Sequence, residues 1–210
     1  MKKSNFYSIV FVIFFLSNYS MAQNQKDTVF LLKKKTNSSI HNVFIEPYKN
    51  SKYYTDLLDF SKFPKNDKLQ VQGLAKKWVP IYLYKYNYYM YIPCDLGLSH
   101  RIYLSNSHIT VEGFELYNYK LNSKIQKFKN SYKFRYIDSD NKNVSVEINI
   151  VDTQKGIAIF NFIKNKISSQ QLMVDADKLK LFPLIVNDCR YSKTSEFKFD
   201  KIDYEKLLKN

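Results

Sequence analysis

The sequence has few of the residues on which most catalytic and cofactor motifs depend. Its four glycines in 210 residues are too few for a Gly-rich loop that cradles a phosphate or a nucleotide. It contains no G-x-S-x-G nucleophile motif, no H-E-x-x-H zinc motif and no Cys-x-x-Cys redox motif. We therefore expect no cofactor and no catalytic residue, and the absences favour a binding protein over an enzyme.

Long apolar runs are also absent, except at the N-terminus. Residues 6–16 form an apolar run that follows two lysines, and small residues occupy the −3 and −1 positions before Gln23. This order predicts a cleavable signal peptide over residues 1–22, since the run is shorter than the about 20 residues that span a bilayer. The mature chain, residues 23–210, is then expected to be exported, to the periplasm or beyond, with no transmembrane segment.

Cysteine and histidine are scarce as well. In an exported chain, an isolated cysteine pair predicts a disulfide, Cys94–Cys189. Cys94 lies near His100, and an imidazole can activate a thiol, but a disulfide would remove that nucleophile. The three histidines, His41, His100 and His108, have no i, i+4 pair, so no metal site is expected.

Short segments with period-two alternation, rich in Tyr, Phe, Ile and Val, dominate the chain and predict β-strands. The clearest are three segments within residues 132–163, joined by polar turns too short for a parallel crossover, which indicates an antiparallel meander. Residues 78–84 and 88–92 form a second hairpin, and Pro80 predicts an edge or a bulge there. Further strands are expected at residues 28–34, 40–46, 101–104, 109–112 and 114–121.

Helical patterns are few. Ser51 is placed to cap a short helix, and Asp203 to cap a last turn near the C-terminus. Residues 169–181 carry apolar residues at helical spacing, although parts of this segment fit a strand equally. The predicted fold is mainly β, a single domain with a few short helices, built as a lipocalin-like antiparallel β-barrel or as a sandwich.

Acidic residues are in the minority, 19 against 33 Lys and Arg, and the charge of +14 becomes +12 without the two lysines of the signal peptide. Residues 116–137 contain no acidic residue, and basic residues alternate there with aromatic ones. Either the lysines bind an anionic component of the cell envelope, or they are the solvent side of amphipathic strands. Nucleic acid is not expected as a partner of an exported protein. The candidate anion-binding residues are Lys120, Lys124, Lys127, Lys129, Lys133 and Arg135.

Tyrosine is abundant, with 18 residues, and tryptophan occurs once. Alternation places Trp78, Tyr82 and Tyr84 on one side of their predicted strand. Such rings can line a cavity for a small apolar or aromatic ligand, or they can simply pack across strands. The first hypothesis is therefore a lipocalin-like carrier with these three ligand-binding residues, and the alternative is an interaction protein of the envelope.

Overall fold

The computed structural model describes residues 28–35, 40–64, 68–95, 98–190 and 195–209. In these residues the chain forms 13 strands and three short helices, one of them at the C-terminus, so the mainly-β prediction is confirmed. The predicted signal peptide, residues 1–22, lies outside the described residues.

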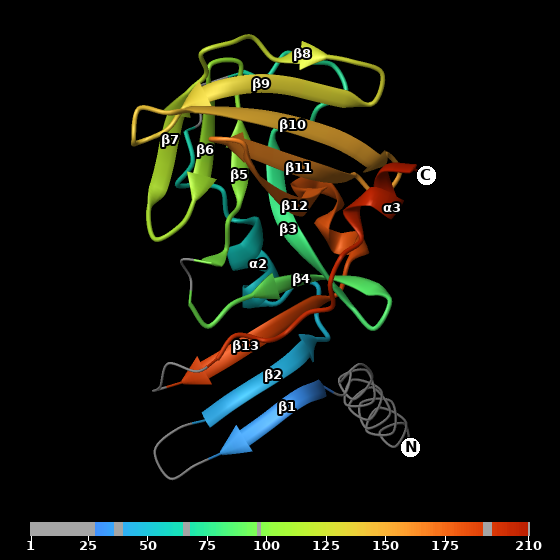
Figure 1. Ribbon diagram of the computed structural model, residues 1–210. Coiled ribbons are helices and arrows are strands. Elements are labelled where there is room, and N and C mark those ends of the chain that lie inside the picture. Colours follow the sequence, from blue (N-terminus) through green and yellow to red (C-terminus); the bar gives the residue numbers. More distant parts are fainter. Residues whose placement is uncertain (1–27, 36–39, 65–67, 96–97, 191–194, 210) are drawn as a thin grey trace, which may run out of the picture.

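The strands form one branched sheet whose two parts we call sheet A and sheet B (Figure 1). Sheet A has the order β1 (Val29–Lys35), β2 (Ile40–Glu46), β13 (Leu184–Arg190), β4 (Asn87–Ile92), β3 (Lys77–Tyr84). Sheet B continues from β3 through β12 (Ile167–Asp175), β11 (Ile157–Lys164), β10 (Asn143–Asp152), β9 (Ser131–Ile137) and β8 (Gln126–Lys127). A branch from β3 adds β5 (Ile102–Leu104), β6 (His108–Glu112) and β7 (Leu116–Lys120). Neighbouring strands are antiparallel except β13 and β4, which are parallel.

Strand β3 belongs to both parts of the sheet, and Pro80 lies where its partners change. Residues 77–80 pair with β5 and β12, whereas residues 81–84 pair with β4. The ladder to β5 ends at Trp78 and the ladder to β4 begins at Ile81, so the missing N–H of proline falls between two ladders. Pro80 therefore marks neither an edge strand nor a bulge; it lies in a buried strand at the crossing point.

Sheet B curves strongly, but it does not close. Strands β7 and β9 approach each other at one isolated bridge, between Leu121 and Tyr136, and the N–H of Asn122 donates to the carbonyl of Arg135 at 3.0 Å. No continuous ladder joins the two strands in the described part of the chain. The closed lipocalin-like barrel is therefore not confirmed, and the sheet is open and branched.

The helices are α2 (Lys52–Leu58), η2 (Ala176–Leu181) and α3 (Tyr204–Lys209). The Ser51 cap is confirmed, because its side chain accepts the N–H of Tyr54. The helix considered for residues 169–181 is wrong over its first half. That half belongs to β12, which lies between β3 and β11 and is buried at residues 172–174, and only a 3-10 helix follows it.

Three apolar clusters fill the spaces around the sheet. The first lies within sheet B and includes Trp78 and Phe160. The second joins both parts of the sheet to α2 and η2, and includes Tyr54 and Leu179. The third covers sheet A and includes Tyr91, which packs against partly buried rings of the C-terminal segment. Strand β3 contributes residues to all three clusters, so this strand connects the core.

Candidate functional site

Six basic side chains gather along β7, β8, β9 and the loops between them, and all six are exposed. We call this set the basic face; it contains Lys120, Lys124, Lys127, Lys129, Lys133 and Arg135. Strand β9 follows the alternation seen in the sequence, because its three aromatic side chains are buried while the side chains between them reach solvent. The amphipathic pattern thus places the charges outside, and it leaves open what they bind.

Few carboxylates neutralise the basic face. The Nζ of Lys133 lies 3.2 Å from Glu147, a cross-strand pair on β9 and β10. Lys127 donates to the carbonyl of Gln72 at 3.0 Å. None of the ion pairs found among the described residues involves Lys120, Lys124, Lys129 or Arg135. These four side chains therefore carry charge that no carboxylate of the described chain balances directly.

A groove of about 400 Å³ runs over the outer face of β9, β10 and β11, within the basic face. The register places Arg135, Ser145 and Ile163 side by side on this outer face. Its polar lining comprises Ser123, Gln126, Lys133, Arg135, Ser145 and Glu147. Glu147 already pairs with Lys133, so Arg135, beside neutral hydrogen-bonding side chains, is the cation of this groove that is open to a phosphate or a carboxylate.

The structure does not bring Trp78 together with Tyr82 and Tyr84. Trp78 is 1% exposed, packs edge-to-face on Phe160 at 5.1 Å, and donates its indole N–H to the carbonyl of Ala75. It belongs to the cluster within sheet B, whereas the two tyrosines pack in the cluster that covers sheet A. The proposed ligand-binding set is thus divided between two clusters.

The rings of Tyr82 and Tyr84 already have aromatic partners. Tyr82 stacks on Phe199 at 4.6 Å, and Tyr84 packs edge-to-face on Phe197 at 5.1 Å. Burial raises the pKa of Tyr82 to about 12, with Glu196 as the next cause, so this phenol stays protonated at neutral pH. These contacts fit the alternative in which the tyrosines pack across strands.

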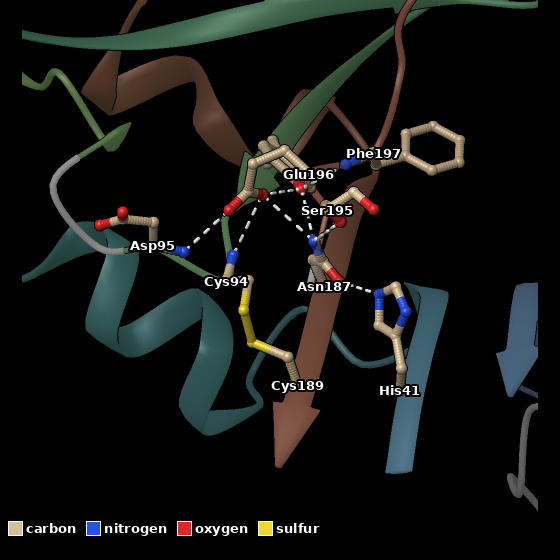
Figure 2. Close-up of a disulfide and its surroundings, with 9 residues drawn as sticks. His41, Cys94, Asp95, Asn187, Cys189, Ser195, Glu196 and Phe197 are labelled. Atoms are coloured by element: carbon tan, nitrogen blue, oxygen red, sulfur yellow. Dashed lines mark hydrogen bonds between the residues drawn. A yellow bond between two sulfur atoms is a disulfide. The ribbon is translucent and has the colours of Figure 1, made fainter. Parts of the chain in front are cut away.

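The predicted disulfide is present: Cys94, after β4, and Cys189, in β13, are bonded, with their Cα atoms 5.7 Å apart (Figure 2). The bond joins positions 95 residues apart in the sequence. It leaves no thiol among the described residues, and the nucleophile considered at Cys94 is therefore not available in this state. A disulfide is typical of an oxidising compartment.

A carboxylate beside the disulfide, Glu196, ties the C-terminal segment to sheet A (Figure 2). It accepts the N–H groups of Cys94 and Asp95, at 3.2 and 2.8 Å, and the side-chain amide of Asn187 at 3.1 Å. Tyr91 also donates its hydroxyl to Glu196, and burial followed by this hydrogen bond raises the pKa of Tyr91. The carboxylate of Glu196 is thus used by hydrogen bonds within the protein, and we interpret this network as structural.

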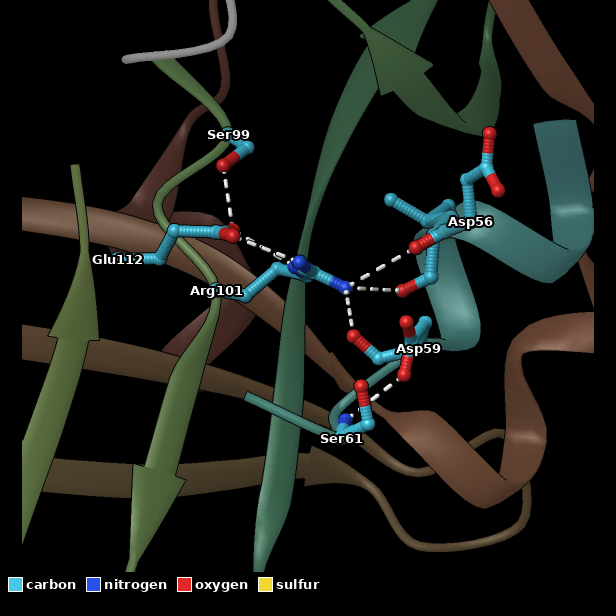
Figure 3. A network of polar contacts seen from close by, with 7 residues as sticks. Asp56, Asp59, Ser61, Ser99, Arg101 and Glu112 are labelled. Carbon is cyan, nitrogen blue, oxygen red and sulfur yellow. Dashed lines mark hydrogen bonds and ion pairs between the residues drawn. The ribbon is translucent and has the colours of Figure 1, made fainter. Parts of the chain in front are cut away.

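A second polar network surrounds Arg101, which is 9% exposed (Figure 3). Its guanidinium binds Glu112 through two hydrogen bonds of 2.6 Å, Nε to Oε2 and Nη2 to Oε1. Its Nη1 donates to carbonyl oxygens at the end of α2, of Leu57 at 2.8 Å and of Asp59 at 2.9 Å. Arg101 therefore joins β5 and β6 to α2, and it also satisfies carbonyls that the helix end leaves open.

The histidines do not converge. His41 shares a hydrogen bond of 2.7 Å with Asn187, and His108 one of 2.8 Å with Ser107. The described residues hold no group of three or more His, Cys, Asp or Glu side chains arranged for a metal ion. In the same part of the chain, no helix combines the length and apolar character needed to cross a membrane.

No known protein family, curated protein or solved structure matches the chain.

Sequence reasoning missed Arg101, Glu112 and Glu196 as organising residues. Arg101 is one of three arginines in a lysine-rich chain. This rarity is a usable signal, because a planar guanidinium can serve a carboxylate and several carbonyls at once. Nothing local marks Glu196, which lies outside the strands and binds Tyr91 on β4, 105 residues earlier, and Asn187 on β13.

Proposed function

We propose that this protein is a binding protein that attaches to anionic groups of the cell envelope through the basic face. One observation carries the proposal: six basic side chains are exposed on β7, β8, β9 and the loops between them, and four of them form no ion pair among the described residues. A surface of one sign attracts and retains ligands of the other sign.

Phosphate and carboxylate groups are the anions that this face would bind. Each lysine or arginine near an anionic membrane contributes about 1 kcal/mol of binding free energy, so several weak contacts add to a useful affinity. The outer groove offers Arg135 beside neutral donors, whereas its Lys133 is paired with Glu147. Lipid head groups and acidic polysaccharides share this chemistry, and the experiment below separates them.

The envelope setting is itself part of the proposal. It depends on the signal peptide predicted from residues 1–22, and the Cys94–Cys189 disulfide is consistent with an oxidising compartment. The carrier hypothesis at Trp78, Tyr82 and Tyr84 stays a prediction. We do not adopt it, because the three rings lie in two separate clusters and already pack on other aromatic side chains.

Neutralising the four unpaired positions should weaken anion binding at least about tenfold, or about 1.4 kcal/mol. The variant carries Lys120→Gln, Lys124→Gln, Lys129→Gln and Arg135→Gln. Binding is measured by co-sedimentation with vesicles of phosphatidylglycerol and phosphatidylcholine, and by titration with polygalacturonate. Raising the salt to 1 M, where the screening length is about 3 Å, should abolish binding of the unmodified protein.

The matched control removes four exposed lysines elsewhere, at residues 155, 178, 180 and 201. It changes the net charge equally and should retain most of the binding. Binding to vesicles alone identifies a lipid ligand, and binding to polygalacturonate alone identifies a polysaccharide. The proposal is wrong if neither probe binds, or if the control variant loses as much affinity as the first variant.

A further inference from the structure

A second pocket, of about 480 Å³, lies on the opposite face of the strands that carry the basic face. In register across four strands stand Tyr136, Val144, Lys164 and Ile167. The adjacent row on the same face includes Phe162 and Ser169, which also pair directly. We call this hollow the end pocket, because it lies where the turns after β9 and β11 close the hairpins.

Aromatic and aliphatic side chains form one wall of the end pocket. Tyr119 from β7 stacks on Tyr136 from β9, with ring centroids 5.0 Å apart and planes 21° from parallel. Phe162 continues this wall from β11, and Ile167 lies at the rim with 73% of its surface exposed. An apolar ligand face placed here would remove this side chain from water, which is favourable by about 25 cal/mol per Å².

The charged groups of the end pocket are already paired with each other. Lys164 binds Asp138 and, at 2.8 Å, Asp140. Asp138 also accepts the N–H groups of Asp140 and Lys142, at 3.0 and 2.9 Å. These contacts, with Asp138 first, raise the pKa of Lys164, so it remains charged and paired at neutral pH. An anion would meet two carboxylates here and a cation would meet Lys164, so the pocket disfavours a charged ligand.

The remaining polar lining is neutral. It consists of the hydroxyls of Ser139 and Ser169, the amide of Asn165 and the phenols of the two tyrosines. Burial raises the pKa of Tyr136 to about 12, so its hydroxyl keeps its proton. The pocket therefore pairs an apolar wall with several neutral hydrogen-bonding groups.

We propose that the end pocket binds a neutral saccharide ring. The C–H face of a sugar is apolar and packs on aromatic rings, while its hydroxyls need neutral donors and acceptors, and the end pocket supplies both along two residue rows. Its volume falls in the lower part of the about 300–1,000 Å³ range of small-molecule pockets, which suits one or two sugar units. The site goes beyond the proposed function and does not depend on the basic face.

The test is binding of the fluorescently labelled full chain to an array of neutral glycans in 1 M salt, where the screening length is about 3 Å. We expect at least one neutral glycan to bind. Tyr119→Ala, which removes half of the stacked pair, should weaken this binding at least tenfold, and so should Ile167→Ser. Ile167 is mostly exposed, so this second variant keeps the folded structure.

The matched control is Ile163→Ser, on the same hairpin and on the outer face, which should bind like the unmodified protein. The neutralised four-residue variant of the basic face should also retain glycan binding, so the two proposals can fail separately. The saccharide proposal is overturned if no neutral glycan binds, or if Tyr119→Ala and Ile167→Ser bind as well as Ile163→Ser does.

Discussion

Replacing Arg101 by alanine is expected to lower the free energy of unfolding by about 3–5 kcal/mol. The substitution removes the two 2.6 Å hydrogen bonds to Glu112 and takes away the cation that pairs with this carboxylate, whose side chain is 17% exposed. It also leaves the carbonyls at the end of α2 without their donor. A buried charge without its partner is among the few defects that reach this magnitude.

Urea denaturation measures this effect, and Lys133→Ala is its matched control. Lys133 and Glu147 also form a cross-strand ion pair, but the side chain of Lys133 is 50% exposed. Loss of an exposed pair changes the free energy of unfolding by about 0–1 kcal/mol. Arg101→Lys should recover only part of the loss, because an ammonium cannot serve the carboxylate and the carbonyls together. If Arg101→Ala and Lys133→Ala lowered the free energy of unfolding equally, burial of the Arg101–Glu112 pair would not add to stability, and the prediction would be wrong.

The pH dependence gives a separate readout of the same pair. Burial alone raises the pKa of Glu112, but hydrogen bonds from Arg101 and Ser99 outweigh it and lower the pKa below 4.5. A carboxyl with a lowered folded-state pKa stabilises the protein above its unfolded pKa, and this contribution is lost as the pH falls through the folded pKa. The stability difference between the unmodified protein and Arg101→Ala should therefore shrink in acid. A difference that stays constant from pH 7 to about pH 3 would contradict this prediction.

Loss of the Cys94–Cys189 disulfide should lower the free energy of unfolding by about 2–5 kcal/mol. The bond spans 95 residues, so its removal frees a long loop in the unfolded chain. It also releases the end of β4 from β13 beside the Glu196 network, where the C-terminal segment is attached. The affected region is thus sheet A, on the side covered by Phe197 and Phe199.

Denaturation with and without dithiothreitol measures this effect, and the Cys94→Ala, Cys189→Ala double variant is the control. The reductant should destabilise the unmodified protein and leave the double variant unchanged. Hydrogen exchange should show faster opening of β13 and β4 than of β10 and β11 after reduction. An unchanged denaturation midpoint in the reductant, with both thiols titrating as free, would refute the prediction.

The strands were predictable from the sequence where one face of the strand is buried and the other is exposed to solvent. The alternation of β9 and β10 identifies their buried residues correctly, and Ser51 identifies the start of α2. The hairpin turn was predicted over residues 85–87 and occupies two of them, because Asn87 already pairs with Tyr84. Lys85 and Tyr86 both have positive φ, the type I′ geometry that suits the twist of the flanking strands. These signals are local, and local signals are what a single sequence carries.

The helix prediction for residues 169–181 was partly wrong for a physical reason. Leu172, Met173 and Val174 are all fully buried, because β12 lies between two cores and is covered on both faces there. Such a strand shows no alternation, and its apolar residues can match a helical spacing by coincidence. The parallel pairing of β13 with β4 was equally hidden, since no local pattern specifies which distant strand lies alongside.

The sequence predicted which residue types are exposed or buried better than it predicted which of them lie together in a site. Alternation along β9 indicated that Lys133 and Arg135 reach solvent, and the other four basic side chains are exposed as well. Alternation could not show that β3 passes from sheet B to sheet A near Pro80. Because of this change, Trp78 and Tyr82 enter different clusters. The end pocket could not be predicted from the sequence for a similar reason. Tyr119 and Phe162 line the same pocket only because strands distant in the sequence curve toward each other.

The shared strand β3 also determines how the molecule can come apart. Its first half is hydrogen-bonded within sheet B and its second half within sheet A, and its side chains enter all three apolar clusters. If β3 left either sheet, apolar side chains in the clusters of both sheets would be exposed to water. Detachment of β3 is therefore strongly penalised, and this strand should be among the last to open, whichever sheet begins to unfold first.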